Sequence, residues 1–209
     1  MSSTATSARL YPGLNLRRDD ASHRQAEEVM FGFWVFLMSD LVLFALLFAT
    51  YITMLGGEAG GPGPTALFDI TSTAAETGLL LLSSFTFGMA SLALRYGQHR
   101  ILLLLWLAAT LGLGLVFLGF EVYDFITMIG KGGVPSRSGF LSAFFALVGT
   151  HGLHVTFGSI WITVMMVQVL TFGPDRLGKT RLLRLGLFWH FLDIVWVGVF
   201  SVVYLQGLA

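Results

Sequence analysis

The stretch SGFLSAFFALVGTHGLHVTFG, Ser138–Gly158, places two histidines inside a run of residues otherwise suited to lipid. An imidazole at that depth is costly unless it faces protein, water or a polar headgroup. His151 and His154 are three residues apart, so they share one side of a helix. The stretch therefore predicts a membrane-spanning helix that carries a polar feature of the protein interior.

The composition extends this prediction to the whole chain. Its 209 residues are 55% hydrophobic and 11% charged, and the mean hydropathy is +0.78, whereas a soluble domain carries about 25% charged residues. The absence of cysteine excludes disulfides, thiolate catalysis and cysteine-ligated zinc or iron–sulfur sites. The formal net charge of zero provides no global field that would recruit nucleic acid.

Five stretches are long enough to cross a bilayer. A spanning helix needs about 20 apolar residues, and Gly- and Pro-rich or short polar connections separate the five. The fourth stretch is too long for one straight crossing and is expected to tilt or to project from the membrane. The predicted spans are Val29–Leu55, Thr71–Leu94, Ile101–Phe120, Gly139–Phe172 and Leu185–Leu205.

The positive charges predict the orientation. Ten of the twelve Lys and Arg residues lie in the N-terminal segment or around the second and fourth connections, and only Lys131 and Arg137 lie on the other side. The basic side stays in the cytoplasm, so we expect a cytoplasmic N-terminus and an external C-terminus. Residues 1–28 are then a polar cytoplasmic tail, and residues 29–209 form the membrane domain. Five spans do not divide into two inverted halves, which argues against a secondary transporter.

Asp40 lies deep in the first predicted span. It follows the start of that span by about eleven residues, which corresponds to a depth of roughly 17 Å. An ionised carboxyl is expensive there, so we expect Asp40 to be protonated or paired with a polar group of another helix. Two interpretations stay open: a proton-linked or lipid-contacting carboxyl, or a hydrogen-bonded residue of helix packing.

Three further carboxyls are expected near the external face. Glu76 follows the start of the second span, and Glu121 and Asp124 close the third. Such interfacial carboxylates are usually hydrated or paired, which favours a structural role. Glu121 is the better candidate for a structural partner, because its neighbours within Gly119–Tyr123 crowd it.

The two histidines of the opening stretch allow a sharper interpretation as metal or haem ligands. A bare His-x-x-His on one helix is nevertheless a poor haem site, because two axial ligands must approach from opposite faces of the ring. Hydrogen bonds to other helices or to lipid headgroups are therefore favoured for His151 and His154.

A second polar pair is expected in the last span. His190 and Asp193 are three residues apart in LFWHFLDIVW and could form a buried pair on one helix face. A catalytic dyad would need a nucleophile within reach, and nothing in the sequence points to Ser39 or Ser201. An intramembrane hydrolase is therefore disfavoured.

Four motifs together resemble one protein family. They are GFWVFLMSDLVLFALLFATY (Gly32–Tyr51), GFEVYDF (Gly119–Phe125), the opening stretch, and LFWHFLDIVWVGVFSVVYL (Leu187–Leu205). With these motifs the chain resembles subunit III of the haem–copper respiratory oxidases, and more narrowly the five-span form of the cytochrome bo-type ubiquinol oxidases. The resemblance covers nearly the whole chain after the tail.

This resemblance implies an all-α integral membrane protein with two bundles. The first two spans are expected on one side of a V-shaped cleft that holds phospholipid, and the last three spans on the other. Asp40 takes the place of an acidic residue that is Glu in other members, and the histidines are implied to lie in the bundle interior. The residues expected to make lipid or interior polar contacts are Asp40, Glu76, Glu121, His151, His154, His190 and Asp193.

The resemblance further implies a non-catalytic accessory subunit of a proton-pumping ubiquinol oxidase. Haem, copper and ubiquinol are expected in the large catalytic subunit, and no catalytic residue, metal or cofactor is expected in this chain. The implied partners are oxidase subunits I, II and IV and membrane phospholipids in a bacterial inner membrane. The implied roles are stabilising the catalytic subunit, holding lipid and helping to sustain proton uptake.

Other functions stay open from the sequence. Subunit III of a cytochrome c oxidase or menaquinol oxidase, or the related subunit of a nitric oxide reductase system, would share much of the pattern. A stand-alone small transporter or an intramembrane enzyme belongs to a different class. Co-purification separates these alternatives, because an oxidase subunit is isolated with haem-bearing partners and a stand-alone protein is colourless.

Overall fold

The structure is a computed structural model that describes residues 20–59, 63, 70–96, 99–172 and 176–205. Every regular element in these residues is helical. The elements are α1 (Asp20–Thr53), α3 (Ile70–Arg95), α4 (Arg100–Gly130), the short 3-10 helix η2 (Pro135–Arg137), α5 (Gly139–Phe172), α6 (Arg176–Val199) and the π-helical turn η3 (Phe200–Leu205).

The prediction of five spans is confirmed. The segments long and apolar enough to cross a membrane are Glu27–Thr53, Ile70–Arg95, Arg100–Gly130, Gly139–Thr171 and Gly178–Leu205. The chain is therefore a multi-pass membrane protein, because only helices with internally satisfied backbones of this length and hydropathy suit a bilayer.

Two predicted boundaries need correction, those of the third and fifth spans, whereas the first span begins at Glu27, close to the predicted Val29. The third span does not end at Phe120, because α4 continues to Gly130, which places Glu121 and Asp124 inside the helix. α6 begins at Arg176, before the predicted start at Leu185. α1 begins at Asp20, within the predicted tail, and residues 1–19 of that tail lie outside the described residues.

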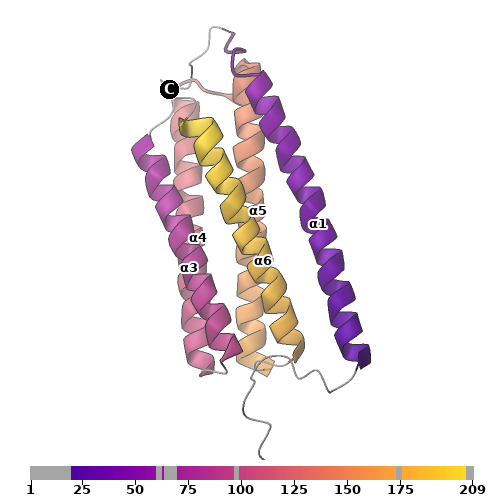
Figure 1. Ribbon diagram of the computed structural model, residues 1–209. Coiled ribbons are helices and arrows are strands. Elements are labelled where there is room, and N and C mark those ends of the chain that lie inside the picture. Colours follow the sequence, from indigo (N-terminus) through magenta and orange to yellow (C-terminus); the bar gives the residue numbers. More distant parts are fainter. Residues whose placement is uncertain (1–19, 60–62, 64–69, 97–98, 173–175, 206–209) are drawn as a thin grey trace, which may run out of the picture.

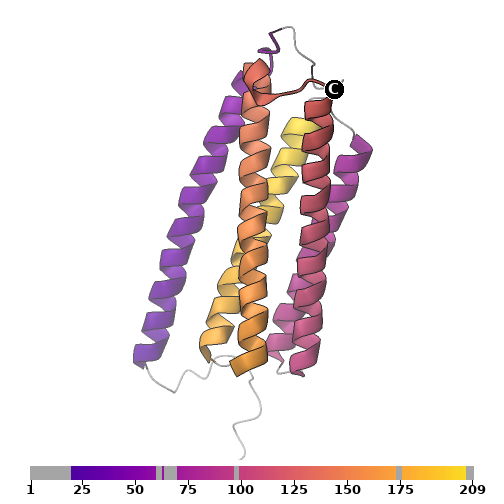
Figure 2. The same cartoon turned by 180° about the vertical axis from the view of Figure 1, so that it is seen from behind.

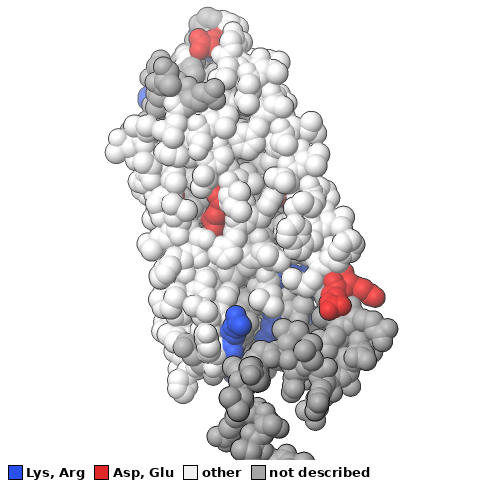
Figure 3. Space-filling model, in the orientation of Figure 1, with Lys and Arg blue, Asp and Glu red and all other residues white. Residues whose placement is uncertain are grey.

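The spans run side by side and alternate in direction (Figures 1 and 2). α1 begins at one end of the bundle and η3 finishes at the other, as an odd number of crossings requires. Lys and Arg side chains appear mainly toward the end where α1 begins, while the middle of the visible face is almost free of charge (Figure 3). Which end faces the cytoplasm stays a prediction from the charge distribution.

The predicted pairing of the first two spans is wrong. α1 packs against α5 and α6, whereas α3 packs against α4 and α6, and α1 and α3 lie on opposite sides of the bundle (Figures 1 and 2). The physical reason is the short connection between Arg95 and Arg100, which makes α3 and α4 antiparallel neighbours. The long connection from Thr53 to Ile70 places no such constraint on α1 and α3.

Glycines let α6 approach its neighbours closely. A Cβ at Gly114 of α4 or Gly158 of α5 would lie 2.9 or 3.0 Å from the Trp189 ring of α6. A Cβ at Gly198 would lie 3.2 Å from the Phe48 ring of α1. Helices in lipid are not driven together by the hydrophobic effect. Small residues at their contacts let the backbones approach closely, so that van der Waals packing can hold them. α6 therefore lies at the centre of the bundle, in contact with α1, α3 and α5.

Candidate functional site: polar pairs buried between the helices

The Asp40 carboxyl of α1 meets the His154 imidazole of α5, with 3.2 Å between Oδ1 and Nε2. The Asp40 side chain is only 8% exposed and that of His154 21%. The rings of Phe44 and Phe188 pack around the imidazole. Asp40 is thus paired across a helix interface, close to the middle of the span Glu27–Thr53.

This pair can hold one proton without losing its contact. His154 Nδ1 lies 2.7 Å from the carbonyl oxygen of Thr150, and because a carbonyl only accepts, Nδ1 carries a hydrogen. A further proton on Asp40 would give O–H···N between neutral groups, and one on Nε2 would give a charged pair. Both forms keep α1 hydrogen-bonded to α5. The second carboxyl oxygen, Oδ2, is buried and has no hydrogen-bond partner among the described residues.

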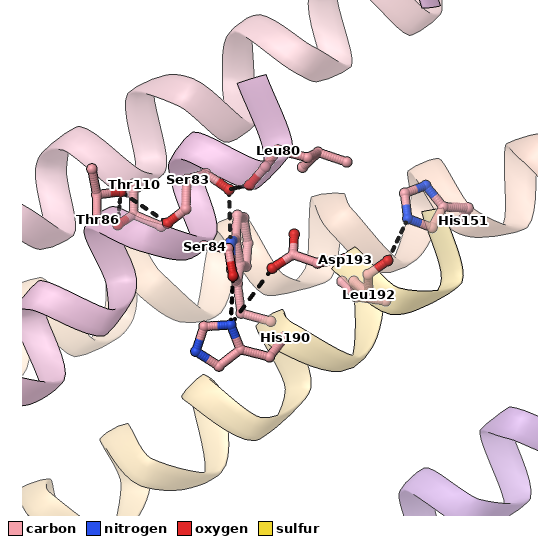
Figure 4. A network of polar contacts seen from close by, with 10 residues as sticks. Leu80, Ser83, Ser84, Thr86, Thr110, His151, His190, Leu192 and Asp193 are labelled. Atoms are coloured by element: carbon pink, nitrogen blue, oxygen red, sulfur yellow. Dashed lines mark hydrogen bonds and ion pairs between the residues drawn. The ribbon is translucent and has the colours of Figure 1, made fainter. Parts of the chain in front are cut away.

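A second pair lies on α6 and faces α3 (Figure 4). His190 Nδ1 lies 3.6 Å from Asp193 Oδ2 and 2.7 Å from Ser84 Oγ of α3. The Phe87 ring meets the imidazole edge to face, with 5.9 Å between the ring centroids. The His190 side chain is 45% exposed, whereas Asp193 is buried.

Serine, histidine and aspartate thus come together here, but not as a catalytic triad. In a triad the carboxylate holds one imidazole nitrogen and the hydroxyl meets the other. Here Ser84 and Asp193 both approach Nδ1 of His190, so the imidazole has no route for relaying a proton from hydroxyl to carboxylate. The nucleophiles considered from the sequence, Ser39 and Ser201, bond to carbonyls of their own helices instead.

The two histidines of the opening stretch serve different interfaces. His151 is fully buried, and its Nε2 donates to the carbonyl oxygen of Leu192 on α6 at 3.2 Å. Its ring packs against Phe117 and Trp196. His154 turns instead toward α1. The shared helix face predicted from their spacing therefore splits between two neighbouring helices, and the two imidazoles do not converge on one ligand.

Glu121 lies over the backbone of α5. A Cβ on Gly152 would lie 2.5 Å from Glu121 Oε1, so the absence of a side chain at Gly152 makes room for the carboxyl. Both carboxyl oxygens are buried and lack hydrogen-bond partners in the part of the chain that the structure describes. Its sequence neighbours Phe120 and Tyr123 are exposed, whereas Glu121 is buried.

Glu76 joins α3 to α4. Its side chain lies close to that of Asp124 of α4, and Ser72 Oγ of α3 lies 3.4 Å from Asp124 Oδ2. Glu76 is 1% exposed, so it lies in the protein interior.

Several interior hydrogen bonds were not anticipated. Trp189 Nε1 donates to Ser83 Oγ at 3.0 Å, Trp196 Nε1 donates to Thr77 Oγ1 at 3.1 Å, and hydroxyls of α3 and α4 also meet in the core (Figure 4). The available signal was weak: two tryptophans flank His190 and Asp193 in LFWHFLDIVW. A buried indole N–H usually finds a partner, but a sequence does not identify which hydroxyl supplies it.

No group of three or more His, Cys, Asp or Glu side chains within the described residues could hold a metal ion. Each histidine of the spans is instead engaged with a different protein group. Together, the fold and these pairs define a class: an all-helical, five-span membrane protein whose ionisable side chains join helices.

Comparison with known proteins places the chain within this class. The family model "Cytochrome c oxidase subunit III" matches residues 20–208. The chain is 50% identical to a protein of Pseudomonas putida named cytochrome bo(3) ubiquinol oxidase subunit 3, over 89% of each chain. It is 47% identical to the protein of that name from Pseudomonas aeruginosa, over 90% of each chain. A probable quinol oxidase subunit 3 of Staphylococcus epidermidis is 40% identical, over 90% of this chain and 94% of its own length.

The chain belongs to the cytochrome c oxidase subunit III family. The resemblance inferred from the four sequence motifs is thereby confirmed.

Proposed function

We propose that this chain is the non-catalytic subunit III of a proton-pumping, bo-type ubiquinol oxidase in a bacterial inner membrane. The observation that carries the proposal is the 50% identity, over 89% of both chains, to a relative named for that complex. The five spans agree with a subunit of this kind. A stand-alone transporter has no support in the comparisons.

The proposal assigns the redox chemistry to another subunit. Haem, copper and ubiquinol would bind the catalytic subunit, which passes electrons from ubiquinol to oxygen. The support from this chain is the state of its intramembrane histidines: His151, His154 and His190 each contact a different protein group and lie at different helix interfaces. Oxidase subunits I, II and IV are the proposed partners.

Within the complex, the chain would stabilise the catalytic subunit, hold phospholipid and help to sustain proton uptake. The broad apolar surface of α1 supports a lipid contact, because large residues such as Phe31, Trp34 and Val42 are exposed along it. The Asp40–His154 pair supports a polar contact at the lipid-facing edge, because α1 is the least buried of the spans.

Affinity purification tests the assignment. The tagged chain, extracted from its own membranes in mild detergent, should be isolated with a haem-bearing partner whose reduced-minus-oxidised spectrum is that of an oxidase. A complex purified without this chain should oxidise ubiquinol at first and then lose activity during turnover. A haem-free preparation would refute the assignment. Full activity over many turnovers without the chain would refute the lipid and proton-uptake roles.

The electron donor needs its own measurement. The family model is described by a cytochrome c oxidase subunit, whereas the bacterial relatives are named ubiquinol or probable quinol oxidase subunits. We expect oxygen consumption by the purified complex with ubiquinol and not with reduced cytochrome c. Faster turnover with menaquinol or cytochrome c would change the donor and leave the subunit assignment intact.

A further inference from the structure

One side of α6 is open although this helix is the most buried of the five spans. The open residues follow each other at spacings of three and four, so they form one continuous line along the helix. We call this line the α6 stripe; it consists of Leu183, Leu187, His190, Ile194 and Val197 of α6 and is continued by Ser201 of η3. Ile194 is 71% exposed, and Leu183 and Val197 are also exposed.

The α6 stripe contains an imidazole at mid-membrane. His190 lies near the middle of the span Gly178–Leu205, about 18 Å from its beginning at the rise of an α-helix. Its Nδ1 is hydrogen-bonded to Ser84 on the bundle side, with Asp193 at 3.6 Å, and 45% of its side chain is exposed. Figure 4 shows Ser84 and Asp193 approaching the same nitrogen of the ring, while His151 contacts Leu192.

Contact with lipid is unfavourable for the His190 imidazole at this depth. Ionisable residues inside membranes almost always face protein or water and pair with another polar group. A stripe of the same spacing on α5 provides the contrast; it consists of Leu153, Phe157, Ile160, Val164, Val167 and Thr171. The large residues of this α5 stripe are exposed as well, and its only polar member is Thr171 at the helix end, where the hydroxyl bonds to Val167 O.

We propose that the α6 stripe is the surface through which this chain docks onto another membrane-embedded subunit of its oxidase. The occupant is a transmembrane helix of the haem-bearing subunit that offers a hydrogen-bonding group to His190 Nε2. The three-and-four spacing of the stripe suits the knobs-into-holes packing of one added helix. The inference rests on the proposed function, since a partner subunit must exist.

Ser84 orients the imidazole for this contact. Its hydroxyl hydrogen-bonds to Nδ1, so Nε2 is the nitrogen left for the partner. The two neutral tautomers differ in which ring nitrogen carries the hydrogen: Nε2 is an acceptor when Nδ1–H donates to Ser84, and a donor when the Ser84 hydroxyl donates to Nδ1. The site can therefore match either a hydroxyl or a carbonyl on the opposing helix. The α5 stripe, by contrast, is left to the lipid.

Photo-crosslinking in intact membranes tests the location. Ile194 of the α6 stripe and Ile160 of the α5 stripe are each replaced, in separate variants, by p-benzoylphenylalanine. After illumination, the tagged chain is purified and its adducts are identified by mass spectrometry. We expect a covalent adduct with the haem-bearing subunit from position 194 and several-fold less from position 160.

The outcomes separate the inference from the proposed function. Haem that is retained without an adduct at position 194, or with equal adducts at both positions, would overturn the docking surface alone. An adduct with a second copy of this chain would also overturn it. A tagged chain isolated without haem would overturn the proposed function itself.

Two substitutions test the polar contact. His190→Phe removes both nitrogens, and retention of the haem-bearing subunit through detergent washing should fall on the order of threefold, as expected for one interhelical hydrogen bond. His190→Gln keeps a donor and an acceptor and should retain the partner nearly as the parent does. Circular dichroism checks that both variants stay helical. Parental retention by His190→Phe would contradict a polar contact at this position.

Discussion

Two histidine–aspartate pairs lie in the same bundle and are built differently. Asp40 and His154 come from α1 and α5 and approach to 3.2 Å. His190 and Asp193 lie one turn apart on α6 and approach only to 3.6 Å. In the first pair both side chains are largely covered, whereas in the second the imidazole is exposed. The same two residue types therefore make one contact that joins helices and one that presents an imidazole outward.

This difference indicates which helix depends on a polar pair for its position in the bundle. α1 is the least buried span and packs only against α5 and α6 to any substantial extent, so a hydrogen bond to His154 adds to thin apolar packing. α6 is held by three neighbours and by close contacts at glycines. Its position does not depend on Asp193, whose two oxygens are buried and lack hydrogen-bond partners within the described residues.

The largest effect is expected when the interhelical pair is broken. Asp40→Leu removes the hydrogen bond between α1 and α5 and leaves His154 Nε2 without its partner. The free energy of unfolding in detergent micelles should fall by about 1–2 kcal/mol, the upper part of the range for polar contacts between membrane helices. An unchanged value would show that apolar packing alone holds α1.

A proximity assay can show that the loss is local to α1. The chain has no cysteine, so Phe48→Cys with Gly198→Cys introduces a unique pair at the contact of α1 with α6. Crosslinking of the two thiols by a short bismaleimide should become slower when Asp40→Leu is added. Ser39→Ala, on the same helix next to Asp40, is the matched control, because the Ser39 hydroxyl bonds only to Val35 O of its own helix.

Breaking the second pair should not lower the free energy of unfolding. Asp193→Leu removes a buried carboxyl whose oxygens accept no hydrogen bond, and replacing such a group with an apolar one of similar size is neutral or stabilising. The free energy of unfolding of the isolated chain should stay unchanged or rise by about 1 kcal/mol. A loss as large as that of Asp40→Leu would mean that the carboxyl stabilises α6 through His190.

The sequence predicts the spans better than it predicts their neighbours. Runs of about 20 apolar residues mark the helices because the bilayer demands them. These runs are apolar all round, so no face indicates whether α1 packs on α3 or on α5. Glu121 and Asp124 resemble the end of a span in the sequence, but α4 continues to Gly130. Glu121 is accommodated against α5 where Gly152 has no side chain.

The same limit applies to the candidate site, where the sequence identifies the ionisable residues but not their partners. The sequence identifies Asp40, His154, His190 and Asp193 as costly in lipid, since that cost depends only on residue type and depth. It does not identify Ser84 as a partner of His190, because a single hydroxyl is common in membrane helices and can bond to its own backbone. Pairing between helices depends on packing, which single-span patterns do not contain.

Double-mutant cycles compare the two pairs directly. The cycle of Asp40→Asn with His154→Gln should give a coupling energy of about 0.6 kcal/mol, the average for hydrogen bonds between membrane helices. The cycle of Asp193→Asn with His190→Gln should give a coupling near zero, because 3.6 Å is beyond hydrogen-bond distance. Equal couplings, measured by unfolding in detergent, would remove the distinction drawn between the pairs.

The smallest effect is expected at Ser84. Its hydroxyl lies 2.7 Å from His190 Nδ1, but Asp193 stands close enough to take over that nitrogen after a small rotation of the ring. Ser84→Ala should therefore lower the free energy of unfolding by less than about 0.5 kcal/mol. Nitrogen NMR of the labelled imidazole should show the change at Nδ1 and leave Nε2 nearly unaffected. A loss above about 1 kcal/mol would make Ser84 a main link between α3 and α6. The second pair would then join helices as the first one does.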